Sequence, residues 1–113
     1  MNRFQSQDEI ENVVRGFETC QTDKADFRHP QHLAVAVWYV HTLDRDAALD
    51  RMRSGLMRFL DHHGVDKGKY NETVTVFWID KIVTKLNELG PEVSVVEKCN
   101  TILEHGFSRM NAD

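Results

Sequence analysis

Apolar residues recur at intervals of three and four along most of the chain, the spacing that places side chains on one face of an α-helix. The pattern is clearest between Asp46 and His63, and the next residue is Gly64, a residue type common after helix ends. Similar patterns predict four further helices, at about residues 7–20, 30–43, 71–89 and 93–106. The sequence therefore predicts an all-α protein of about five helices.

Residues typical of helix starts precede three of these segments. Ser6, followed three residues later by Glu9, forms a capping-box pattern, Pro30 suits a first helical turn, and Asn71 is a favourable N-cap. The intervening loops are short. Because short loops favour antiparallel packing of successive helices, we expect a single-domain bundle over residues 1–113 with mostly antiparallel neighbours and a frayed tail after about residue 107.

Composition and charge exclude several classes of protein. The chain has 113 residues with a formal net charge of -4, and its 14 Lys and Arg residues form no basic block, so nucleic acid and anionic membranes are poor partners. The longest apolar run, Leu33 to Val40, is much shorter than the roughly 20 residues of a membrane span. The N-terminal residues lack the apolar stretch of a signal peptide, and Cys20 and Cys99 have no CxxC partner. We therefore expect a cytoplasmic protein with two reduced, buried thiols.

Two histidines begin the second predicted helix. In the segment FRHPQH, His29 and His32 are three residues apart, which places them on one helix face. Two such imidazoles can bind one metal ion, or one can act as a base while the other holds a substrate oxygen. The alternative is that His29 caps the helix and His32 is an ordinary interior histidine.

A second polar cluster begins the fourth predicted helix, in the segment KYNETVT. Helix capping explains Asn71 and the acidic first turn, but it does not require the neighbouring hydroxyl groups. The second and fourth helices are both apolar nearly all round, so we expect both to be central, roughly parallel and close at their N-terminal ends. The predicted ligand-binding residues are His29, His32, Tyr70, Glu72 and Thr73. The metal candidates among them are His29, His32 and Glu72, although no metal is predicted firmly.

Other candidate chemistry is weaker. The remaining histidines, His41, His62, His63 and His105, lie near predicted helix ends, where capping and packing explain them. The sequence has no Gly-rich phosphate loop, HExxH, GxSxG or paired CxxC motif. Whether the protein is an enzyme stays open at this point.

The segments FRHPQHL and YNETVTVFW resemble a family of small bacterial helical proteins of unknown function. Its pattern has an HxxHL helix start, a following tyrosine, an AL..MR.G..RF helix and a YHETLT helix start. The matching positions cover about residues 20–80 and are His29, His32, Leu33, Tyr39, Ala48, Leu49, Met52, Arg53, Gly55, Arg58, Phe59, Tyr70, Glu72, Thr73 and Thr75. Asn71 departs from the pattern, which has a histidine there, and an asparagine amide is a poor transition-metal ligand. The resemblance implies a shared polar site without a particular chemistry.

Two functions are consistent with these features. The first is a pocket formed by the histidines, Tyr70 and Glu72 that binds a small polar ligand, with or without a divalent metal ion. The second is a non-enzymatic interaction module, a homodimer formed through the broad apolar face of the fourth helix.

Overall fold

The computed structural model describes residues 4–104, and this part of the chain contains five α-helices and no strand. The elements in order are α1 (Gln7–Glu18), α2 (His29–Thr42), α3 (Arg45–His62), the single-turn 3₁₀ helix η1 (Lys67–Lys69), α4 (Glu72–Leu89) and α5 (Val95–Glu104). The predicted all-α fold is confirmed. The predicted end of the last helix near Gly106, His105 and the predicted tail after residue 107 lie outside the described residues.

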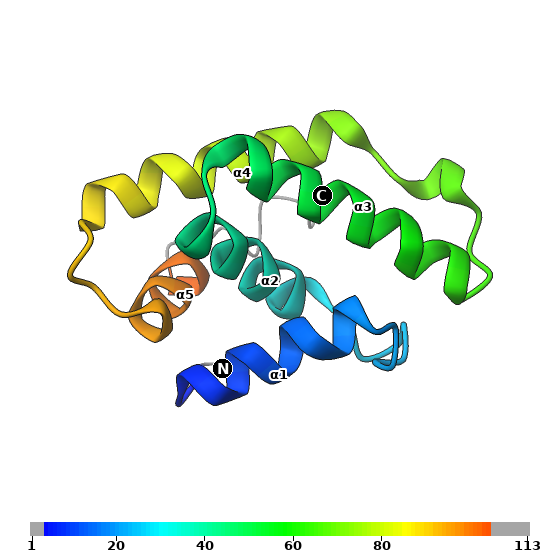
Figure 1. The fold of residues 1–113 in the computed structure, drawn as a ribbon, viewed down its shortest axis with the longest axis horizontal. Coiled ribbons are helices and arrows are strands. Elements are labelled where there is room, and N and C mark those ends of the chain that lie inside the picture. Colours follow the sequence, from blue (N-terminus) through cyan, green and yellow to red (C-terminus); the bar gives the residue numbers. More distant parts are fainter. Residues whose placement is uncertain (1–3, 105–113) are drawn as a thin grey trace.

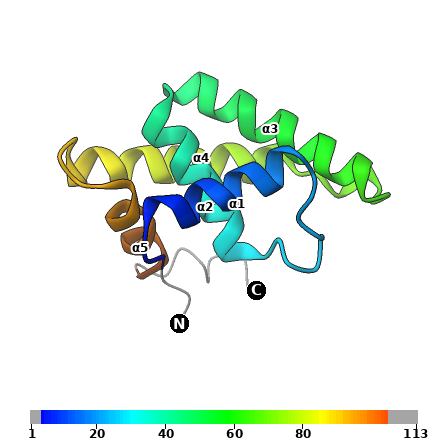
Figure 2. The same ribbon diagram turned by 60° about the horizontal axis from the view of Figure 1, so that its bottom comes forward.

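Helix α2 is the centre of the bundle, because it packs against all four other α-helices. The first four helices alternate in direction along the chain, so α2 and α4 run the same way and α3 runs opposite to both (Figure 1). Helix α1 lies along one side of α2 and α5 lies across its C-terminal end (Figures 1 and 2). Two successive reversals thus bring the N-terminal ends of α2 and α4 to the same side of the molecule.

The helix ends are fixed by local hydrogen bonds at the predicted positions. The Ser6 hydroxyl accepts from the Glu9 amide, and the Asn71 side chain accepts from the Val74 amide. Gly64 has a φ of 70°, and the amides of Gly64 and Val65 donate to carbonyls in the last turn of α3. This is the left-handed C-terminal cap that glycine adopts without steric cost.

Helix α4 is less central than its sequence predicts. Phe77 and Val74 are 45% and 38% exposed. Within residues 4–104, α4 packs against α2, α3 and α5, and these three helices do not cover Phe77 and Val74 fully. The expectation that α2 and α4 are both central is therefore right for α2 and wrong for α4.

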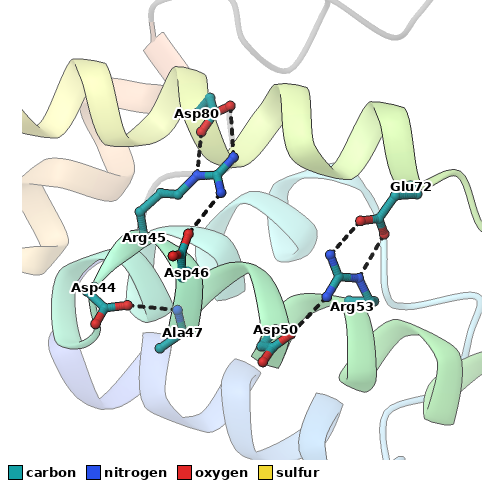
Figure 3. Close-up of polar contacts among 8 residues, drawn as sticks. All are labelled: Asp44, Arg45, Asp46, Ala47, Asp50, Arg53, Glu72 and Asp80. Carbon is teal, nitrogen blue, oxygen red and sulfur yellow. Dashed lines mark hydrogen bonds and ion pairs between the residues drawn. The ribbon is translucent and has the colours of Figure 1, made fainter.

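Two arginines on α3 join it to α4. Arg45 forms two hydrogen bonds with Asp80, at 2.8 and 3.2 Å, and Arg53 forms two with Glu72 (Figure 3). The two pairs are slightly more than two helical turns apart on each helix, and together they fix the register of α3 against α4 along the helix axes. That register determines which α4 residues face the interior.

The core lies between α2 and its neighbours and contains both cysteines. Cys20 and Cys99 are buried free thiols, as the sequence predicts, and burial raises the pKa of Cys99 to about 12. Helices α1 and α3 approach closely at Gly55, where an added Cβ would lie 2.5 Å from a ring carbon of Phe17. In the described part of the chain, no helix has the length and apolarity to cross a membrane.

Candidate functional site

A cavity of about 360 Å³ lies between α2, α3 and the start of α4. Its polar lining comes from the first turn of α2 and from the segment that begins α4: His29, His32, Lys69, Tyr70, Asn71 and Thr75. Its remaining lining is apolar: Leu33, Ala36, Met52, Leu56, Leu60, Val74, Trp78 and Ile79. An apolar cavity with a few polar groups is typical of a small-molecule site.

The structure brings His29 and His32 to this cavity together. The His32 ring packs on Phe27, with ring centroids 4.3 Å apart, and the His29 ring meets Trp78 edge-on at 5.4 Å. Burial, assisted by nearby His29, lowers the pKa of His32 to about 4. His32 is therefore neutral near pH 7, and its ring offers one N–H donor and one nitrogen acceptor.

Tyr70 and Thr75 also reach the cavity, but both hydroxyls already donate within the protein. The Tyr70 hydroxyl donates to Glu72 Oε1 at 2.6 Å, and the Thr75 hydroxyl donates to the Asn71 carbonyl at 3.0 Å. Burial and the hydrogen bond to Glu72 raise the pKa of Tyr70. The single O–H of each group is thus already used, so each hydroxyl oxygen can only accept a hydrogen bond from a ligand.

Glu72 and Thr73, two predicted site residues, do not line the cavity. The Glu72 carboxylate is exposed and accepts from Arg53 and Tyr70, and these hydrogen bonds, the Arg53 one first, lower its pKa to about 2. No hydrogen bond or ion pair joins Glu72 to His32 within residues 4–104. The structure therefore separates the predicted carboxylate from the predicted histidines.

This separation bears on the metal hypothesis. Among the residues that the structure describes, no three His, Cys, Asp or Glu side chains gather as a metal-binding group. The polar groups of the described residues at the cavity are two imidazoles with lysine, asparagine, tyrosine and threonine groups, without a carboxylate. Two imidazoles are fewer than the three or four protein ligands of a typical zinc site.

Sequence reasoning missed most of the cavity wall. Thr75 belongs to it in place of Thr73, and helical register carries the signal: Asn71, Thr75 and Trp78 share one face of α4. The apolar wall had no signal, because residues such as Met52 and Leu56 follow the same pattern whether they fill a core or line a cavity. Lys69 at the end of η1 was not singled out either.

The other described histidines have structural surroundings. The His63 ring packs at a tilt against Phe59 with centroids 4.3 Å apart, and exposed His62 lies edge-on to His63. His41 contacts Lys98 at the other end of α2. None of the three lines the cavity beside His32.

Comparisons of the chain with family models, with curated proteins and with solved structures found no match. Fold and site together therefore define the class: a five-helix all-α bundle, over the described residues, with a mostly apolar cavity between α2, α3 and α4.

Proposed function

We propose that the protein binds a small molecule in the cavity between α2, α3 and α4, and that this molecule has an apolar body with one uncharged hydrogen-bonding end. The observation that carries the proposal is a mostly apolar cavity of about 360 Å³ with the His32 ring in its wall, and the lowered pKa of His32 supports it. The body would contact side chains such as Met52 and Leu56. The polar end would meet the His32 ring.

The charge at the cavity supports an uncharged ligand. Among the described residues that line the cavity, Lys69 is the only lysine, arginine or carboxylate residue, and Lys69 is exposed. The described part of the wall offers a metal ion two imidazoles and no carboxylate, which is fewer ligands than a typical divalent metal site has. The ligand proposed here therefore differs from the small polar ligand expected from the sequence, because it is mainly apolar.

A fragment titration tests the proposal. Phenol, indole and cyclohexanol serve as probes, with toluene as the probe that lacks a polar group. Binding at the cavity is expected to shift the ring protons of His32 and to change the fluorescence of Trp78, which lines the same wall. Shifts that are absent for every probe, or that are spread over exposed side chains, would contradict the proposal.

Three variants test whether the fragments bind in the cavity rather than elsewhere on the protein. Ala36→Leu adds three carbons at the cavity wall and is expected to abolish fragment binding without lowering the melting temperature. Ala47→Leu adds the same atoms on α3 away from the cavity and is the matched control. His32→Phe keeps the ring packing on Phe27 and is expected to weaken the binding of phenol more than the binding of toluene.

A second candidate, the homodimer, is favoured by the outer face of α4. Phe77 and Val74 are three residues apart, so they form one exposed apolar face. Sedimentation of the wild type and of Phe77→Ser over a range of concentrations tests it. A wild type that dimerises and a variant that does not would support the interface, whereas two monomers would exclude it.

The cellular context is part of the same proposal. Two buried free thiols favour a reducing compartment, so we propose a cytoplasmic location.

We also propose membership in the bacterial helical family that the sequence resembles. The shared cavity position of His29, His32 and Tyr70 supports it.

A further inference from the structure

A second cavity, of about 220 Å³, lies where the C-terminal ends of α2 and α4 meet α5. Its walls include Val40 and His41 from α2, Leu86 and Asn87 from α4, and Lys98 from α5. It shares no lining residue with the first cavity.

The unusual group at this cavity is Lys98, which is only 7% exposed. Its Nζ lies 3.0 Å from Nδ1 of His41, and no carboxylate pairs with it in the described part of the chain. An ammonium group has three N–H donors, so this contact leaves two of them for other acceptors. A buried cation without a counter-charge is costly unless an anion or a set of acceptors compensates it.

The surroundings of Lys98 compensate its charge only partly. Burial first, and the Lys98 charge second, lower the pKa of His41, so the imidazole accepts the hydrogen bond as a neutral ring. The nearest acidic residue of α4 along the chain, Glu88, pairs with Lys85. The carbonyl ends of α2 and α4 carry about half a unit of negative charge each, which favours a cation but contributes no hydrogen bond to Lys98.

We propose that the second cavity binds a small organic carboxylate. Lys98 would form the ion pair, the Asn87 amide would supply a further donor, and the apolar side chains of Val40, Leu86 and Pro91 would contact a short alkyl chain. One buried cation with an apolar wall matches a monoanion that has a hydrocarbon part. A phosphate dianion would need more charge and more donors than this wall supplies.

The test is a titration of the wild-type protein with sodium butyrate at constant ionic strength, monitored through the His41 and His32 rings by NMR. The expected result is a saturable shift at His41 with no shift at His32, together with a rise in melting temperature. Sodium phosphate and sodium chloride form the comparison arms. Equal responses to all three salts would overturn the proposal, as would a saturable response to phosphate alone or no response at all.

Lys98→Met keeps the length of the side chain and removes its charge. Butyrate is expected to bind this variant at least about tenfold more weakly, which is the loss of one charged hydrogen bond. In butyrate-free buffer its melting temperature is expected to equal or exceed that of the wild type, because a buried charge has been removed.

Lys85→Met removes a charge from the same region of the surface without touching the cavity, and it is the matched control. Unchanged butyrate affinity in Lys98→Met would show that Lys98 is only a structural cation and would overturn the proposal. If Lys98→Met does not fold, the wild-type arms still decide, because they need no variant.

Discussion

Arg53 of α3 donates hydrogen bonds to both carboxylate oxygens of Glu72 on α4, with its Nε 2.9 Å from Oε1 (Figure 3). The same Oε1 accepts from the Tyr70 hydroxyl at 2.6 Å. Arg53 also reaches back to Asp50, one turn earlier on α3. Glu72 is thus an anchor between α3 and the start of α4, and it holds Tyr70 in place at the cavity.

Glu72→Gln is expected to lower the melting temperature at pH 7 but not at pH 2. The pKa of Glu72 falls from its usual 4.5 to about 2 in the folded protein, so the folded state binds fewer protons than the unfolded state. The stabilisation is therefore present above about pH 4.5 and is lost as the pH falls toward 2. Melting curves of both proteins across this range, at low salt, check the prediction.

The control for Glu72→Gln uses salt. Because the pair with Arg53 is exposed, 1 M sodium chloride is expected to shrink the difference between the two proteins at pH 7. Curves that stay parallel from pH 7 to pH 2 would contradict the assignment of the pH effect to Glu72.

Gly55→Ala tests the close approach of α1 and α3. An alanine Cβ would lie 2.5 Å from a ring carbon of Phe17, so the Phe17 ring or one of the helices must shift. We expect a loss of about 1–3 kcal/mol in the free energy of unfolding, although alanine favours helices by about 1 kcal/mol. Denaturant unfolding gives the value.

The control is a double-mutant cycle with Phe17→Leu, which removes part of the ring. Gly55→Ala should cost less in that background than in the wild type, because the contact is relieved. Ser54→Ala, on the exposed neighbouring position, is expected to be close to neutral. Strictly additive effects of the two core changes would refute the contact as the cause.

Asn100 of α5 forms two hydrogen bonds with the backbone of Phe4, which precedes α1. Its buried side chain accepts from the Phe4 amide at 2.9 Å and donates to the Phe4 carbonyl at 3.0 Å. Asn100→Ala is expected to cost about 1–3 kcal/mol, because buried backbone groups lose their partner. Hydrogen exchange should then become much faster at the Phe4 amide, whereas Asn12→Ala on the exposed face of α1 should leave it slow.

The fold was largely predictable because its determinants are local. Ser6, Asn71 and Gly64 act within a few residues of themselves, and the structure confirms the helix ends that they predict. The exposure of Phe77 was not predictable. A broad apolar face indicates burial on two sides, but which sides are covered depends on how α5 and α3 pack, and this is set by contacts far apart in sequence.

The candidate site was predictable in part for the same reason. His29, His32 and Tyr70 share a cavity because two reversals of the chain bring two helix starts together, and short loops indicate such reversals. Glu72 was assigned to that cavity because it lies two residues after Tyr70 in the same polar segment. Its partner Arg53 is 19 residues earlier, and only the register of α3 against α4 pairs them.

The His32 ring makes the stability of the folded protein sensitive to acid. Because its folded pKa is about 4 against a usual 6.5, the folded protein favours the neutral ring. The neutral ring therefore contributes to the free energy of unfolding fully above about pH 6.5, and this contribution is lost as the pH falls toward 4. The full pKa difference corresponds to at most about 3 kcal/mol. His32→Phe should therefore be less sensitive to acid than the wild type in this window, as measured by unfolding at pH 4 to 7. His62→Phe, at an exposed position, should keep the wild-type profile.

The titration of His32 also tests whether the Glu72 carboxylate lies close to the histidines of the cavity. A carboxylate close to an imidazole raises its pKa, so removing that charge from a shared site would lower the His32 pKa further. In the structure, the Glu72 carboxylate instead accepts hydrogen bonds from Arg53 and Tyr70. We therefore expect the His32 ring protons to titrate identically in the wild type and in Glu72→Gln by NMR. A shifted curve in the variant would mean that the carboxylate reaches the histidines in solution, and the divalent metal hypothesis would regain its acidic ligand.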